Sequence, residues 1–240
     1  MTPLPIIETE SDFEALALRV ARFIAARISG TSGRFGLSLS GGTTPKRVYE
    51  LLGAGDLIPV PDWQRVHLFW GDERFVPPDH EMSNFRMARI ALIDRVPVPG
   101  AQVHPVPTGG NSPVEAAASY EAVLQGYYGA KMLDPARPLF DLTLLGLGED
   151  GHTASLFPNT KALGERDAWV TSIIGAKPEP RISLTYPALE SSREILFIVS
   201  GASKREILAR VLANDEALPA ARLSTRGTIR IFADQAAMGR

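Results

Sequence analysis

The stretch LFDLTLLGLGEDGH, residues 139–152, indicates the fold class of this chain. Its first half, 139–145, is apolar almost throughout, as expected of a strand buried on both faces of a parallel sheet. Its second half places Asp150 and His152 in a glycine-rich turn directly after that strand. In open α/β sheets, ligands bind beyond the carboxyl ends of the strands. The stretch therefore predicts both a parallel α/β sheet and a polar site at one of its edges.

Strands and helices alternate along the rest of the chain. The predicted strands cover residues 34–40, 65–70, 102–106, 139–145, 168–174, 181–185, 193–200 and 228–233. Helical spacing of apolar residues, together with capping signals, predicts helices over 10–29, 44–53, 83–96, 112–129 and 203–213. This alternation is typical of an α/β fold in which a mostly parallel sheet carries helices on both faces. Since no internal repeat, low-complexity tract or long linker divides residues 1–240, we expect a single domain.

The composition is that of an ordinary soluble globule, and it excludes several kinds of chemistry. The chain has 240 residues, a net charge of −2 and no cysteine, so disulfides, thiolate metal sites and cysteine nucleophiles are excluded. The small net charge provides no broad basic field, so we expect neither nucleic acid nor a membrane as a partner. The N-terminal sequence lacks a secretory signal, and no run of about 18 apolar residues could span a membrane. We therefore expect a cytoplasmic protein, and a monomer, because no amphipathic tail suggests an obligate partner.

Four polar loops follow predicted strands and should lie at the same edge of the sheet. They are Ser40–Lys46 (SGGTTPK), Gly71–Pro77 (GDERFVP), Gly146–His152 (GLGEDGH) and Gly201–Lys204 (GASK). Loops at the carboxyl edge of a parallel sheet can converge on one pocket. The sequence therefore predicts one composite site.

The first of these loops, Ser40–Lys46, has the features of a phosphate cradle. Its two glycines let the backbone approach an anion closely, and its serine and threonine hydroxyls can donate hydrogen bonds. The helix predicted to begin at Pro45 would add free N–H groups and the positive end of its dipole. A tight strand-to-helix turn with an ordinary cap would have the same sequence. The spacings of a P-loop and of a dinucleotide-binding loop are absent, so a dinucleotide is disfavoured.

His152 is the candidate acid–base residue of the composite site. An imidazole in ordinary surroundings titrates near pH ~6.5, so it can take and return protons at neutral pH. Asp150, two residues earlier, could orient the ring and stabilise its cation. Histidines in turns are more often structural, and the three at positions 67, 80 and 104 are assigned structural or surface roles. His152 differs because it follows a buried strand, among three other polar loops.

The remaining charged loops supply candidates for anion binding, each with a plainer alternative. Asp72 and Arg74 follow the aromatic strand 65–70, and Arg74 could hold a phosphate or a developing oxyanion unless the loop is simply solvated. Lys204 lies near the start of a helix, where a cation opposes the helix dipole unless an anion is bound nearby. The alternative interpretation is a solvated surface lysine without a binding role. The chain lacks zinc-binding histidine motifs and the G-x-S-x-G elbow, so neither a metal site nor a serine hydrolase is indicated.

Three motifs, in their order along the chain, resemble those of the 6-phosphogluconolactonase family: SGGTTP, FWGDERFVPPDHEMSNFRM and LGLGEDGHTASLFP. The second and third are specific, whereas the related glucosamine-6-phosphate deaminases and isomerases look similar at the first. The resemblance implies a modified Rossmann-like, doubly wound fold. It also implies hydrolysis of 6-phospho-D-glucono-1,5-lactone to 6-phosphogluconate in the pentose phosphate pathway, without a metal or an organic cofactor.

The resemblance further implies a role for each matched residue. His152 corresponds to the general base of the family, and Asp72 and Arg74 belong to its charged loop. The residues that match its sugar-phosphate contacts are Ser40, Gly41, Gly42, Thr43 and Lys204, with Arg181 as a further phosphate candidate.

Two other functions are alternatives at this point. An isomerase or deaminase of an amino-sugar phosphate would use the same phosphate pocket. The related deaminases, however, carry a glutamate five residues after the matching histidine, where this chain has Phe157. A non-catalytic sugar-phosphate sensor usually carries a DNA-binding segment, and nothing basic or helix-turn-helix-like precedes the first predicted strand. Both features favour the lactonase.

Overall fold

The computed structural model describes residues 4–57, 59–110 and 112–240. A six-stranded sheet lies at the centre of the folded molecule. Its strands run in the order β1 (Ile6–Glu10), β9 (Thr228–Asp234), β8 (Glu194–Val199), β5 (Leu142–Leu145), β2 (Phe35–Leu39) and β3 (Val66–Trp70). Every neighbouring pair is parallel. Strands β2, β5 and β8 are buried along their whole length, as expected of strands covered on both faces, and most of their residues are apolar. The predicted parallel α/β fold is confirmed.

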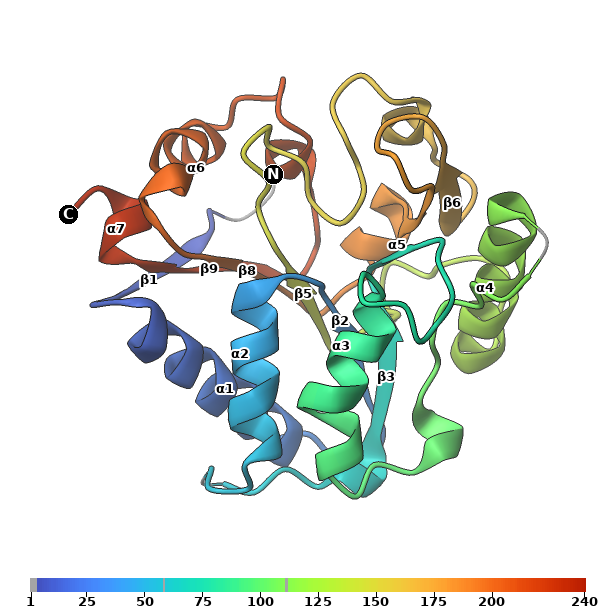
Figure 1. Cartoon of the computed structure of the whole chain (residues 1–240), viewed down its shortest axis with the longest axis horizontal. Helices are drawn as coiled ribbons and strands as arrows, with labels where there is room; N and C mark the ends of the chain where they lie inside the picture. The colour runs from blue at the N-terminus through green and yellow to red at the C-terminus, as the bar shows by residue number, and fades with distance from the viewer. Residues whose placement is uncertain (1–3, 58, 111) are drawn as a thin grey trace.

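Helices lie on both sides of this sheet (Figure 1). α1 (Phe13–Ser29), α2 (Thr43–Gly53) and α3 (Asn84–Ala91) stand side by side, and α6 (Arg205–Leu212) lies across strands β8 and β9 from α1 and α2. α4 (Pro113–Tyr128) packs against the smaller sheet described next. Two short helices, α5 (Tyr186–Glu190) and α7 (Gln235–Met238), follow β7 and β9. Among the described residues, no helix is long and apolar enough to cross a membrane.

A second sheet consists of three short antiparallel strands in the order β4 (Asp72–Arg74), β7 (Arg181–Leu184) and β6 (Val170–Ile173). The chain passes into it at Gly71, whose N–H donates to the Leu39 carbonyl and whose carbonyl accepts from the Leu184 N–H, each at 2.9 Å. The polar sequence predicts a loop at 71–77 and gives no sign of a separate sheet. The difference arises because β4 pairs with a segment more than a hundred residues away along the chain.

Several element boundaries also differ from the sequence predictions. The predicted strand 102–106 is wrong: Gly100–Gln102 form a 3₁₀ turn, and only Val103 bridges to β3, since the prolines at 105 and 107 cannot donate to a sheet. The predicted helix 83–96 ends at Ala91 and is followed by a 3₁₀ turn over Ile93–Arg95. β1 has no predicted counterpart, because an edge strand with partly exposed residues lacks the pattern of a buried strand.

His67 and His104 form a pair of imidazoles beside β3. Nδ1 of His67 lies 3.1 Å from Nε2 of His104, and the ring planes are parallel to within 2°. One nitrogen must donate and the other accept, so the bond requires at least one neutral ring. Burial and, secondarily, the charge of Arg34 lower the pKa of His67, while burial and His67 lower the pKa of His104. The pair therefore stabilises the β3 edge in its neutral form.

Protonation of this pair should destabilise the fold in mildly acid solution. Both folded-state pKa values lie below the unfolded value of about 6.5, so the unfolded chain binds more protons as the pH falls through that value. The free energy of unfolding should decrease accordingly. We expect the variant His67→Phe to lose part of this dependence, measured by urea unfolding at about pH 7 and about pH 5. The exposed histidine variant His80→Gln is the control, and a wild-type pH dependence in His67→Phe would exclude the pair as its source.

Candidate active site

The four polar loops meet in one pocket of about 290 Å³ at the carboxyl ends of β2, β5 and β8. The site residues predicted from the sequence that line it are Ser40, Gly41, Gly42, Thr43, Asp72, Arg74, His152 and Lys204. Two predicted residues stand behind this lining: Asp150 contacts His152, and Arg181 lies next to Arg74. The structure thus brings together side chains that are separated by up to 164 positions, from Ser40 to Lys204.

Asp150 orients the imidazole of His152. Its Oδ1 lies 2.5 Å from Nδ1 of the ring and also accepts the backbone N–H of His152 at 3.1 Å. Although burial alone would raise it, these hydrogen bonds lower the pKa of Asp150, so the carboxylate is ionised at neutral pH. An ionised carboxylate can only accept, which places the ring proton on Nδ1. Nε2 is then the nitrogen that can take a proton from a bound molecule.

Gly148 is required for the position of the ring. A Cβ on this residue would lie 2.0 Å from Nδ1 of His152, well inside contact distance. The turn is held by two backbone bonds, from the Gly148 N–H to the His152 carbonyl (2.9 Å) and from the Gly151 N–H to the Gly148 carbonyl (3.0 Å). Gly151 adopts φ +79°, a conformation that favours glycine. The glycines of the GLGEDGH motif therefore let the chain double back so that the imidazole packs on the backbone.

The strand β4 forms one wall of the pocket through Asp72 and Arg74. Asp72 accepts a 2.6 Å hydrogen bond from the Ser155 hydroxyl, and the Ser155 N–H in turn donates to the Ser183 hydroxyl at 3.2 Å. These bonds fix the loop that carries His152 to the small sheet. Sequence reasoning missed Ser155, although it lies in the quoted TASLF segment, because serine hydroxyls have many ordinary uses in turns.

Arg74 is held at the pocket by a second residue that sequence reasoning missed, Asn84. Nη1 of Arg74 donates to the Asn84 side-chain oxygen and to the Met82 carbonyl, each at 2.8 Å. Asn84 is 2% exposed, and a Cβ on Gly41 would lie 2.0 Å from its side-chain oxygen. The only sequence signal for it was its place in the SNFRM segment. Asn84 therefore touches both the β4 wall and the Ser40–Thr43 loop.

The Ser40–Thr43 loop leads directly into α2. Gly42 is the N-cap with φ +106°, and it offers no side chain to cap the first turn of the helix. The backbone of Ser40 is fixed from beneath by the Tyr49 hydroxyl, which accepts its N–H and donates to its carbonyl, each at 2.9 Å. The helix begins at Thr43, two residues before the predicted start at Pro45. The N–H groups of this turn consequently face the pocket region without a side-chain acceptor at the cap.

Two cations near the pocket form only long ion pairs with carboxylates. Nζ of Lys204 is 4.0 Å from Glu149, and Nη2 of Arg181 is 3.7 Å from Glu179. Arg181 lies directly opposite Arg74 in the β4–β7 pairing, its side chain is 11% exposed, and its Nε has no hydrogen-bond partner among the described residues. Burial, followed by the charge of Arg74, lowers the pKa of Arg181. Like charges opposite each other destabilise a strand pair, so this wall favours a bound anion.

The described residues contain no cluster of metal-binding side chains. No group of three or more histidine, cysteine, aspartate or glutamate side chains there could hold an ion. The groups that line the pocket can transfer a proton at His152. They can also bind an anion through arginine, lysine and backbone N–H groups.

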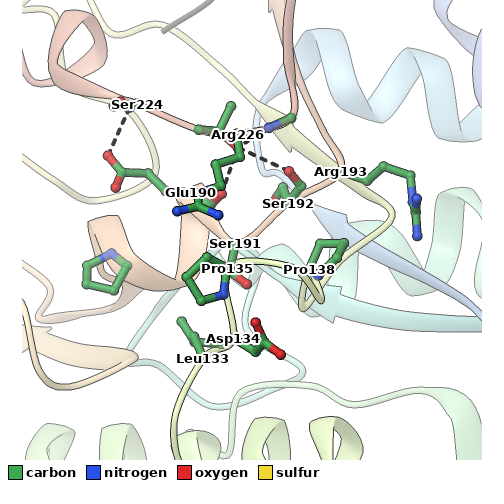
Figure 2. A pocket seen from close by; sticks show the side chains of 13 residues that line it. Leu133, Asp134, Pro135, Pro138, Glu190, Ser191, Ser192, Arg193, Ser224 and Arg226 are labelled. Carbon is green, nitrogen blue, oxygen red and sulfur yellow. Dashed lines mark hydrogen bonds between the residues drawn. The ribbon is translucent and has the colours of Figure 1, made fainter. Parts of the chain in front are cut away.

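A larger hollow of about 410 Å³ lies at the other edge of the sheet (Figure 2). Its lining comes from the segments that precede β5, β8 and β9, and it includes Glu190, Arg193 and Arg226 but none of the predicted site residues. Burial raises the pKa of Glu190, whose carboxylate accepts the Ser224 N–H at 2.9 Å. Because ligands of open α/β sheets bind at the carboxyl edge, this hollow is not the candidate active site.

Comparison with known proteins agrees with the sequence motifs. Residues 11–231 match the profile of the family described as glucosamine-6-phosphate isomerases/6-phosphogluconolactonase. The chain is 42% identical over 239 residues to the 6-phosphogluconolactonase of Nostoc sp., covering 96% of each chain. It is similar to the solved 6-phosphogluconolactonase of Thermotoga maritima, with a TM-score of 0.81, 30% identity, and 96% and 99% of the two chains covered. A monomeric glucosamine-6-phosphate deaminase shares the fold at 19% identity, with a TM-score of 0.82 over 98% of this chain and 99% of the other.

Any side chain at position 148 should displace the imidazole. In Gly148→Ala, the new methyl group would overlap Nδ1 of His152 and break its bond to Asp150. We expect the ring to lose its fixed Nδ1–H tautomer, which the ¹⁵N chemical shifts of the His152 imidazole report directly. Gly146→Ala is the matched control, because no atom lies within 4 Å of a Cβ there. An unchanged tautomer in Gly148→Ala would contradict the packing argument.

Proposed function

The chain belongs to the family of glucosamine-6-phosphate isomerases and 6-phosphogluconolactonases, and we propose that it hydrolyses 6-phospho-D-glucono-1,5-lactone to 6-phosphogluconate. This is the reaction of the oxidative branch of the pentose phosphate pathway that the sequence motifs imply. The observation that carries the proposal is the oriented His152–Asp150 pair at the edge of a pocket rich in anion-binding groups. Enzymatic hydrolysis of a phosphorylated lactone can use both features, a proton acceptor for water and an anchor for phosphate.

The phosphate is the first part of the substrate to assign. We propose that the Ser40–Thr43 loop, Lys204 and Arg181 bind it. The uncapped first turn of α2 offers backbone N–H groups and the positive end of the helix dipole. Lys204 and the largely buried guanidinium of Arg181, each in only one long ion pair, gain a closer counter-charge when an anion binds. Anchoring the phosphate holds the distant lactone carbonyl in one orientation and lowers the entropic part of the barrier.

His152 is proposed as the general base and then the general acid. Nε2 takes a proton from water as the water oxygen attacks the lactone carbonyl carbon. When the tetrahedral intermediate collapses, the bond from that carbon to the ring oxygen breaks, and the imidazolium returns its proton to the ring oxygen. Asp150, held at 2.5 Å from Nδ1, stabilises the imidazolium between the two transfers. Acid–base assistance of this kind contributes typically about 10²–10⁴-fold to the rate.

The negative oxygen of the intermediate needs a donor, and Arg74 is the better of two candidates. The two candidates are Arg74 and the backbone N–H groups near Gly148, which line the pocket. The Gly148 N–H already donates to the His152 carbonyl, whereas Arg74 lines the pocket and carries five N–H donors, which favours Arg74. A preorganised donor is worth more at this oxygen than in water, because the surrounding site is partly desolvated.

The residue beside His152, Phe157, disfavours the deaminase alternative. The ring of Phe157 lies 4.6 Å from that of His152, at the position where related deaminases carry a glutamate. A phenyl ring cannot transfer the proton that opening of an amino-sugar ring requires. Release of ammonia from glucosamine 6-phosphate by the purified protein would reverse this preference.

Removal of the imidazole should abolish most of the catalysed rate. We expect His152→Ala to lower kcat by about 10²–10⁴-fold with little change in KM, because the phosphate anchors remain. The measurement is hydrolysis of freshly prepared 6-phosphogluconolactone against the spontaneous rate, with His80→Ala, an exposed histidine, as control. Wild-type kcat in His152→Ala would remove the assignment, and a wild type no faster than the blank would remove the function.

Removal of the proposed phosphate cations should weaken binding more than turnover. We expect Arg181→Gln and Lys204→Gln each to raise KM by about 10- to 100-fold, the usual effect of losing a charge-assisted hydrogen bond. Steady-state kinetics measures this, and inhibition by 6-phosphogluconate gives an independent affinity. Arg193→Gln is the matched control, since Arg193 is 69% exposed and remote from the pocket. A KM within twofold of wild type would refute the assignment for that residue.

A further inference from the structure

Glu73 stands between the two charged residues of the β4 wall but faces away from the pocket. Its side chain is almost fully buried, at 1% exposure. Its Oε1 accepts the backbone N–H groups of Arg74 (2.7 Å) and Asn84 (2.8 Å). Its Oε2 accepts the N–H of Phe85 (2.7 Å) and the hydroxyl of Ser83 (3.2 Å). One carboxylate thus joins β4 to the N-cap and first turn of α3 through three hydrogen bonds, and accepts a fourth from within β4.

Burial raises the pKa of the Glu73 carboxyl, but the backbone hydrogen bonds from Asn84, Phe85 and Arg74 oppose that rise and favour the ionised form. Three of the donors are backbone N–H groups, which cannot accept a hydrogen bond from a protonated carboxyl. The position also favours a negative charge, because the carboxylate lies at the positive end of the α3 dipole. Ser83 completes the cap by accepting the Arg86 N–H at 3.1 Å. The first turn of α3 is therefore fixed to the strand rather than left to solvent.

Asn84, the first residue of α3, transmits this connection to the pocket. Its side-chain oxygen accepts from Arg74 Nη1 at 2.8 Å, and its side-chain nitrogen donates to the Asp72 carbonyl at 2.9 Å. The same side chain fills the space beside Gly41 that a Cβ would occupy. A shift of α3 along β4 would therefore move Arg74, Asp72 and the Ser40–Thr43 loop relative to one another.

We propose that Glu73 is a positioning residue for the reaction, acting through Asn84 to hold the Arg74 guanidinium and the Asp72 backbone at the pocket. This inference rests on the proposed lactonase function, because only that function makes the pocket catalytic. The hydrogen bonds of Glu73 do not depend on it. Glu73 touches neither substrate nor reacting atoms. Its carboxylate fixes the position of the first residues of α3. The Asn84 side chain, placed in this way, holds the Arg74 guanidinium in its orientation.

The neutral isostere should break this arrangement without changing its size. In Glu73→Gln, an amide NH₂ replaces one oxygen, so at least one backbone N–H now faces a donor and the start of α3 must shift. A misplacement of about 1 Å in a catalytic group can reduce the rate by about 10²-fold. We therefore expect kcat/KM to fall by about 10- to 100-fold in Glu73→Gln, at a temperature where circular dichroism shows the variant to be folded.

A double-mutant cycle distinguishes positioning through Asn84 from a general loss of stability. We expect Asn84→Ala to reduce kcat/KM to a similar extent, and Glu73→Gln/Asn84→Ala to be no worse than the poorer single variant, within about threefold. Asp12→Ala is the matched control: it removes the side-chain cap of α1, lowers the melting temperature and should leave kcat/KM unchanged.

The outcomes separate this inference from the proposed function. The positioning role would be overturned if the loss of kcat/KM in the double variant equalled the product of the two single losses. It would also be overturned if Glu73→Gln kept the same kcat/KM as Asp12→Ala. If Glu73→Gln does not fold, Asn84→Ala decides, because wild-type kcat/KM in that variant would rule out positioning through Asn84. A wild-type protein that does not exceed spontaneous lactone hydrolysis would instead reject the proposed function.

Discussion

The parallel pairing of the central strands is the constraint from which the site follows. When β8, β5, β2 and β3 all point the same way, the chain must leave the sheet at the same edge after each of them. Polar groups from remote parts of the sequence then meet there, and each loop needs an internal attachment. The Tyr49 hydroxyl holds Ser40, and the Asp234 carboxylate holds Gly201, whose loop carries Lys204. The apolar interior of the sheet determines where the loops emerge, and buried hydrogen bonds determine how they lie.

The sequence was most informative where one physical requirement acts on consecutive residues. Burial on both faces makes 139–145 and 193–200 mostly apolar, so these strands were predictable from the sequence pattern. The turn after β5 was equally readable, because only a glycine-rich segment can bring the imidazole of His152 against the backbone at Gly148. Since parallel strands share a carboxyl edge, the convergence of four loops followed from the order of elements.

Features that depend on contacts between distant segments could not be predicted in this way. β4 has only three residues, two of them charged at the pocket, and it is a strand because β7 pairs with it. The opposition of Arg74 and Arg181 exists only in that register, and the sequence alone gives no reason to place two cations side by side. Asn84 and Ser155 are ordinary polar residues whose importance lies in the groups that surround them. Local patterns carry none of this information.

The division into two sheets has a consequence for how such a molecule can change over evolutionary time. Six of the strands belong to the large sheet, whereas one wall of the pocket comes from the small antiparallel sheet, which the chain enters at Gly71. Substitutions on the pocket face of β4 and β7 can therefore remodel ligand preference without repacking the interior. A scaffold arranged in this way can diversify its chemistry by altering a few residues at its margin. That is consistent with a family whose description joins isomerases to lactonases, and with a deaminase that keeps the same architecture at 19% identity.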